Sequence, residues 1–107
     1  MVKIHIANDY SDTPGSRFES EGPFSGERFR DEMLIPKYEE ALAKDEKLVI
    51  NLDGGYGYAT SFLEEAFGGM VRHYKNRDFV TNVVFISEDE PSLVDEIHVY
   101  IEEAEVE

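Results

Sequence analysis

The residues best placed to do chemistry follow an apolar run, residues 48–52, near the middle of the chain. Residues 53–61 combine a carboxylate on Asp53, three glycines and two adjacent hydroxyls, on Thr60 and Ser61. In open α/β sheets, ligands gather outside the carboxyl ends of parallel strands, near helix N-termini. If residues 48–52 form such a strand, this segment is the candidate site.

The glycines of this segment permit several roles. Gly54, Gly55 and Gly57 let the backbone take a positive φ or approach another group closely. The start of the following helix offers free N–H groups and a partial positive charge, which suit a phosphate or a carboxylate. The pattern lacks the lysine of a P-loop and the third glycine of a dinucleotide-binding turn. A tight turn from strand to helix is the simpler interpretation.

The hydroxyls of Thr60 and Ser61 allow three roles: capping the helix, accepting a phosphate, or acting as a nucleophile. A nucleophile needs a base within reach, and His73 lies twelve residues further along the predicted helix, about 18 Å away at 1.5 Å per residue. Ser61 is also not part of a Gly-x-Ser-x-Gly motif. We therefore expect capping first, a phosphate acceptor second and nucleophilic hydrolysis last.

Asp53 has two interpretations: a functional one, as a metal ligand or as an acid or base, and a structural one, in which its carboxylate closes a turn or caps a helix. Glu64 and Glu65 could lie nearby, but compensation of the helix dipole explains them. The chain has no Cys, and its three histidines, His5, His73 and His98, do not show metal-ligand spacing. We expect no metal, no cofactor and no catalytic residues.

The elements that must position this segment alternate along the chain. Period-two or continuous apolar patterns predict strands, and apolar stripes with a helical period predict helices. Residues 8–26 are rich in turn formers and predict a long loop or loose hairpin. The predicted strands are 2–6, 48–52 and 83–86, with a short edge strand at 17–20, and the predicted helices begin at Ser25, Thr60 and Pro91.

This order predicts a single α/β domain, residues 1–107, with a mainly parallel sheet of about four strands and three to four helices. Residues 48–52 and 83–86 are both expected in the centre of the sheet, because they are apolar on both faces. Ser25 is the expected N-cap of the first helix, and Pro36 predicts a kink or restart within it. The acidic end, 102–107, is expected to fray.

Gly68 and Gly69 fall in the middle of the second helix, at a cost of roughly 1 kcal/mol each relative to Ala. Such a pair predicts close packing on the sheet, a kink, or a flat surface for a partner helix. Arg72 follows on an exposed face.

The net charge of −14 restricts the partners. A compact domain with this charge repels polyanions, so direct binding to nucleic acid or an anionic membrane is disfavoured. A basic partner is the natural counterpart, although the charge also serves solubility. The N-terminus does not resemble a signal peptide and no apolar stretch reaches about 20 residues, so we expect a cytoplasmic protein.

The run Ser61-Phe62-Leu63-Glu64-Glu65-Ala66-Phe67-Gly68-Gly69 and the preceding residues 48–60 resemble the STAS-like family of unknown function. Residues 13–17 and 25–30 match the same family. That family is similar to the anti-sigma-factor antagonist domains, whose fold is a mixed sheet with helices packed against it. Those domains bind an ATPase-type serine kinase, which phosphorylates a hydroxyl at the start of the helix after a central strand.

In those antagonists an Asp-Ser-Ser/Thr-Gly motif carries the phosphate acceptor. The matching residues here are Ala59-Thr60-Ser61-Phe62, which keep hydroxyls at both middle positions and lack the Asp and the Gly. The resemblance therefore implies Thr60 or Ser61 as the phosphate acceptor.

We expect a non-enzymatic regulatory module that binds a protein: an ATPase-type serine kinase, another regulator, or a basic nucleic-acid-binding protein. The sequence leaves open whether the chain forms a homo-oligomer. One alternative is an acidic inhibitor that mimics nucleic acid and blocks a basic groove, as some phage-encoded inhibitors do. Another is a small hydrolase or nucleotide-binding enzyme that uses Asp53 and the glycine turn. The expected partner-binding surface comprises Asp53, Gly54, Gly55, Tyr56, Tyr58, Glu64, Glu65, Gly68, Gly69 and Arg72.

Overall fold

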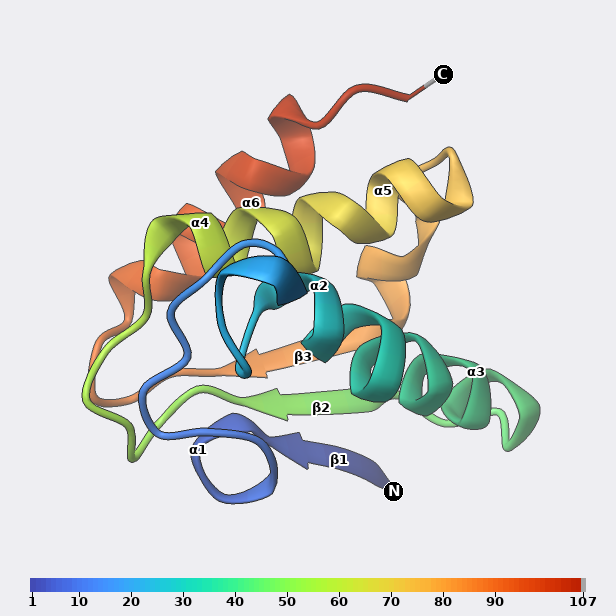
Figure 1. The fold of residues 1–107 in the computed structure, drawn as a ribbon. Helices are drawn as coiled ribbons and strands as arrows, with labels where there is room; N and C mark the ends of the chain where they lie inside the picture. The colour runs from blue at the N-terminus through green and yellow to red at the C-terminus, as the bar shows by residue number, and fades with distance from the viewer. Residues whose placement is uncertain (107) are drawn as a thin grey trace.

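A computed structural model describes residues 1–106 and shows a three-stranded parallel sheet with the long helices on one side (Figure 1). The strands are β1 (Val2–His5), β2 (Leu48–Asn51) and β3 (Val83–Ile86), in the order β1-β2-β3. The predicted α/β class and parallel sheet are confirmed, with three strands in place of about four. All three carboxyl ends meet at one edge, as the location of the candidate site requires.

Two strand predictions are wrong. β3 lies at an edge of the sheet and only β2 is central, because an apolar run does not reveal whether both faces of a strand are covered. Residues 17–20 do not form an edge strand. The N–H of Glu21 donates to the carbonyl of Phe18 and closes a 3₁₀ turn, Glu19–Glu21, which leaves only a one-residue bridge between Ser16 and Ser25.

The predicted long loop before residue 26 is otherwise present. It begins with a single helical turn, α1 (Ile6–Asp9), and continues as irregular chain across the carboxyl edge of the sheet (Figure 1). Tyr10 anchors it, since the Tyr10 hydroxyl donates to the carbonyl of Ser25 at 2.8 Å.

The first long helix comprises α2 (Gly26–Phe29), a π-helical turn (Arg30–Leu34) and α3 (Ile35–Ala43). Ser25 caps it as predicted, since the Ser25 hydroxyl accepts the N–H of Arg28 at 3.0 Å. The restart expected at Pro36 takes the form of the π turn. The N–H of Ile35 donates to Arg30, five residues back, just before the position where Pro36 has no N–H to donate.

The second long helix has the same construction, with α4 (Thr60–Leu63), a π turn (Glu64–Gly68) and α5 (Gly69–Tyr74). The last helix, α6 (Ser92–Glu103), is held at its end by Arg77, whose guanidinium donates to the carbonyls of Ile101, Glu102 and Ala104. This anchoring differs from the frayed end expected from residue 102 onward; Glu107 lies outside the described residues.

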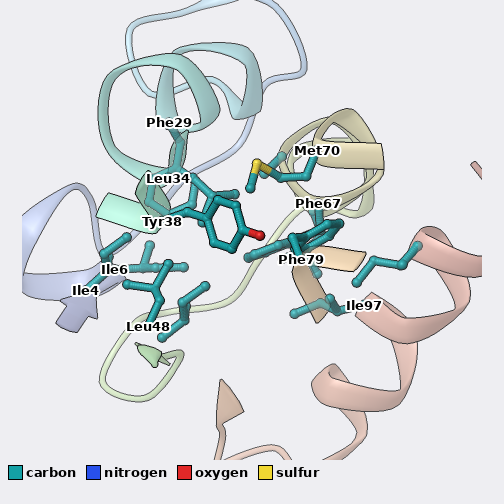
Figure 2. Close-up of a cluster of buried hydrophobic side chains, with 14 of the residues drawn as sticks. Ile4, Ile6, Phe29, Leu34, Tyr38, Leu48, Phe67, Met70, Phe79 and Ile97 are labelled. Atoms are coloured by element: carbon teal, nitrogen blue, oxygen red, sulfur yellow. The ribbon is translucent and has the colours of Figure 1, made fainter. Parts of the chain in front are cut away.

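The core lies between the sheet and these helices. Figure 2 shows side chains from β1, β2 and the helices meeting there, and the buried apolar residues form one cluster. Alternation along the strands sends one set of side chains into this core: Val2, Ile4, Leu48, Ile50, Val83 and Phe85.

Candidate functional site

The loop between β2 and α4 lies beside the loop between β3 and α6 at the carboxyl edge of the sheet (Figure 1). Gly54 and Gly57 have φ angles of 88° and 128°, which favour glycine. At Gly55 a Cβ would lie 3.1 Å from the carbonyl oxygen of Asp12. The predicted conformational roles of the three glycines are confirmed.

Asp53 closes the turn and joins the two loops. The Asp53 carboxylate accepts the N–H of Asp89 at 2.9 Å, and the Asp89 carboxylate accepts the N–H of Gly54 at 3.1 Å. The carbonyl of Asp53 accepts the ring Nε2–H of His5 at 2.8 Å. These hydrogen bonds give Asp53 the turn role that was one of its two predicted interpretations, and they tie the loop to His5 and Asp89.

The two tyrosines of the loop differ sharply. The Tyr56 side chain is 85% exposed, while the Tyr56 backbone N–H donates to the carbonyl of Asp12 at 2.8 Å. Tyr58 points inward and donates to the carbonyl of Leu52 at 2.9 Å. Burial, with a smaller contribution from the charge of Asp53, raises the pKa of Tyr58 to about 12. Tyr58 is therefore a structural residue, and Tyr56 is offered to solvent.

Between the two loops lies a hollow of about 180 Å³. Its lining includes three glycines of the β2–α4 loop, with Asp89 and Glu90 on the side of α6. The two carboxylates make the hollow acidic, so it does not suit a phosphate. In residues 1–106, no group of three or more His, Asp or Glu side chains could hold a metal ion.

Thr60 and Ser61 are the first two residues of α4, and Ala59 occupies the N-cap. The prediction that one of the hydroxyls caps the helix is wrong: the helix begins one residue earlier than a cap at Thr60 requires, and no side chain caps it. The Thr60 side chain is exposed and that of Ser61 is half-buried. Both hydroxyls are thus free of a capping role at the positive end of a continuous 60–74 helix.

Glu64 and Glu65 belong to an ion-pair network that sequence reasoning missed. The Glu64 carboxylate pairs with Arg17 and, at 2.7 Å, with Arg72. The Glu65 carboxylate pairs with Arg30 at 2.6 Å and with Arg17 at 3.3 Å. The network ties the long loop and the first long helix to the second.

Burial of Glu64 opposes its ionisation, but hydrogen bonds from Arg72 and Arg17 outweigh burial and lower its pKa. Arg17 and Arg30 are 47 and 35 residues from their main partners. No local pattern could reveal these contacts.

Gly68 and Gly69 are buried beside the network. A Cβ on Gly68 would lie 2.5 Å from the Glu64 carboxylate, and one on Gly69 would lie 2.6 Å from the Arg30 guanidinium. The glycines make room for the ion pairs, so the predicted close packing is against the side chains of Glu64 and Arg30 and not against the sheet. Glu65, Gly68 and Gly69 are buried and Tyr58 points inward, so the accessible residues of the predicted partner-binding surface are Asp53, Gly54, Gly55, Tyr56, Glu64 and Arg72.

Charge is distributed unevenly along the chain. Residues 78–107 contain ten Asp and Glu and no Lys or Arg, which accounts for −10 of the net −14. Each ion pair in the described residues lies before residue 78. The end of the molecule that carries α6 is therefore strongly acidic.

A parallel sheet covered by helices on one face, with its loops gathered at the carboxyl edge, defines a small α/β domain. The family model of the STAS-like domain of unknown function (DUF4325) matches residues 25–93, and the chain belongs to this family. The match extends from the cap of α2 to the start of α6 and includes the candidate loop. No curated protein and no solved structure is significantly similar to the chain. In residues 1–106, no helix has the length and apolar character needed to cross a membrane.

Proposed function

We propose that this chain is a non-enzymatic regulatory module that binds a partner protein through the loop of residues 53–59 and the start of α4. The observation that carries the proposal is Tyr56, whose side chain is 85% exposed. Its loop is held by two hydrogen bonds, from the Tyr56 N–H to the Asp12 carbonyl and from the Gly54 N–H to the Asp89 carboxylate. Large aromatic side chains supply much of the binding energy at protein interfaces. A rigid loop also loses little entropy on binding.

The two free hydroxyls beside this loop support regulation by phosphorylation. A phosphate at Thr60 would sit favourably at the positive end of the helix, so it would leave the fold intact. It would add about two negative charges to the interface, where repulsion and desolvation weaken binding to an acidic or apolar surface. By likeness to the anti-sigma-factor antagonists, the partner is an ATPase-type serine kinase or another regulator.

A photo-reactive phenylalanine analogue in place of Tyr56 tests the proposed surface in the native host. We expect a discrete crosslinked partner, identified by mass spectrometry. The matched control carries the same analogue at Val99, an exposed position on α6. Equal crosslinking from both positions, or none from position 56, would refute the proposed surface.

The Thr60→Glu variant tests the proposed switch. We expect it to abolish or strongly reduce the crosslink from position 56. Ser92→Glu is the matched control, because Ser92 is also an exposed hydroxyl residue at the first position of a helix. If Thr60→Glu and Ser61→Glu both leave the crosslink unchanged, the module is not switched at these residues.

An acidic inhibitor of a basic protein is the second candidate, favoured by the ten carboxylates of residues 78–107. Binding of this kind weakens steeply with salt. The captured partner distinguishes the two: a basic nucleic-acid-binding protein released by moderate salt supports inhibition, and a kinase or regulator retained in salt supports the first candidate.

A further inference from the structure

The sheet has a second face that no long helix covers. α2 to α6 all lie on the opposite side, as Figure 1 shows. The strand register places the outward side chains of this face in two rows, Lys3–Val49–Val84 and His5–Asn51–Ile86. Only Asp9 of the short α1 joins them at a rim.

Half of this bare face is apolar. Val49 and Val84 are direct neighbours across the strands; Val84 is 42% exposed, whereas Val49 on the central strand is 9% exposed. Ile86 lies two residues further along β3, beside a hollow of about 240 Å³. Parallel sheets are usually covered on both faces, so β-branched side chains in this position indicate a missing layer.

The face carries one cation, Lys3, and the carboxylate of Asp9 lies at its rim. Lys3 is exposed and pairs with no carboxylate in residues 1–106. The nearby carboxylate of Asp9 already accepts the backbone N–H of His5 at 2.8 Å. On a chain of net charge −14, the bare face therefore presents an unpaired cation beside an apolar patch.

The dimensions select a single helix. Two gaps of about 4.8 Å between strands make the face roughly 10 Å wide, which is the width of one α-helix. A second copy of this chain fits badly, because it would set Lys3 against its counterpart and bring two charges of −14 together.

We infer that the bare face of the sheet docks one amphipathic helix of another protein, with its apolar side on Val49, Val84 and Ile86 and a carboxylate beside Lys3. This surface is distinct from the loop of residues 53–59. Its occupant completes the second layer of the sheet, whichever partner binds the loop.

Two designed helical peptides test the inference by methyl NMR of the labelled protein at physiological salt. Both have the same leucine stripe, one flanked by glutamates and the other by lysines. We expect shifts of the Val49, Val84 and Ile86 methyl groups, with several-fold tighter binding of the glutamate peptide even though the net charge opposes it. Tighter binding of the lysine peptide, shifts centred elsewhere, or no shifts with either peptide would overturn the inference.

Variants complete the test. Val84→Lys should weaken binding of the glutamate peptide at least tenfold. Lys3→Glu should reverse the preference, so that the lysine peptide binds more tightly than the glutamate peptide. Val99→Lys is the matched control, an equally exposed valine on α6, and should change nothing.

Thr60→Glu should also leave peptide binding unchanged, which separates this surface from the proposed switch. Dimerisation of the protein through this face would contradict the inference.

Discussion

At the scale of single residues, Glu65 is the least replaceable charge in the molecule. Glu65 is 9% exposed, and its carboxylate accepts a hydrogen bond from the Arg30 guanidinium. The same guanidinium also donates to the backbone carbonyl of Glu65 in the π turn. One guanidinium thus neutralises a buried carboxylate and satisfies a backbone group. Breaking a buried pair on one side leaves an uncompensated charge.

We predict that Glu65→Gln lowers the free energy of unfolding by about 2 kcal/mol, below the range for fully buried pairs because Arg30 is partly exposed. Urea denaturation measures the loss. Glu40→Gln, which breaks exposed pairs with Lys37 and Lys44, is the control and should cause no measurable change. Equal effects of the two substitutions would show that burial of the network does not matter.

Glu64 predicts a dependence on pH. Its folded pKa is below the ordinary value of 4.5, so its charge stabilises the fold above that pH, and the contribution is lost as the pH falls through the folded pKa. We predict that wild type is more stable than Glu64→Gln at neutral pH. The difference should shrink from about pH 4.5 downward in urea titrations. A constant difference down to pH 3 would contradict this origin.

At the scale of elements, the close crossing of α2 and α4 sets the position of the candidate loop. A Cβ on Gly26 would lie 2.5 Å from the carbonyl oxygen of Phe62, a backbone atom that cannot turn away. The crossing therefore needs glycine at position 26. It also brings Phe29 and Phe62 together, with ring centroids 5.5 Å apart.

We predict that Gly26→Ala destabilises the fold by about 2 kcal/mol, within the usual range for overpacking. Gly15→Ala is the control, because a Cβ there meets its nearest atom at 3.8 Å. Thermal unfolding of both variants tests this prediction. Similar melting temperatures for the two variants would show that α2 and α4 can move apart without loss of stability.

Periodicity predicted the three strands, the three long helices and the site of the loop, because these depend on local patterns of apolar residues. The N-cap at Ser25 could be predicted for the same reason, because it depends only on neighbouring residues. The edge position of β3, the bare second face and the Arg–Glu network depend on contacts between distant residues, as between Arg30 and Glu65. The cap of α4 was misplaced because helix boundaries vary by a residue or two.

At the scale of the whole molecule, net charge sets the behaviour in salt. A charge of −14 on 107 residues destabilises the compact state by self-repulsion. The repulsion is screened beyond a Debye length of about 10 Å at 0.1 M salt. We predict that the melting temperature rises between low salt and 0.15 M sodium chloride. A fall would mean that the ion pairs before residue 78 outweigh the repulsion.

The charge distribution gives this small domain surfaces of different chemistry. The part of the chain that forms α6 is acidic, whereas the bare sheet face carries Lys3 beside apolar side chains. The loop of residues 53–59 lies at the carboxyl edge of the sheet (Figure 1).

The most direct test of the proposed function is the affinity of the captured partner for variants of the exposed tyrosine. We predict that Tyr56→Ala weakens binding at least tenfold in isothermal titration, because truncation of an exposed aromatic anchor typically costs 2 kcal/mol or more at an interface. Val99→Ala should leave the affinity unchanged. Unchanged affinity for Tyr56→Ala, in a variant that folds as wild type, would contradict the proposed role of the loop.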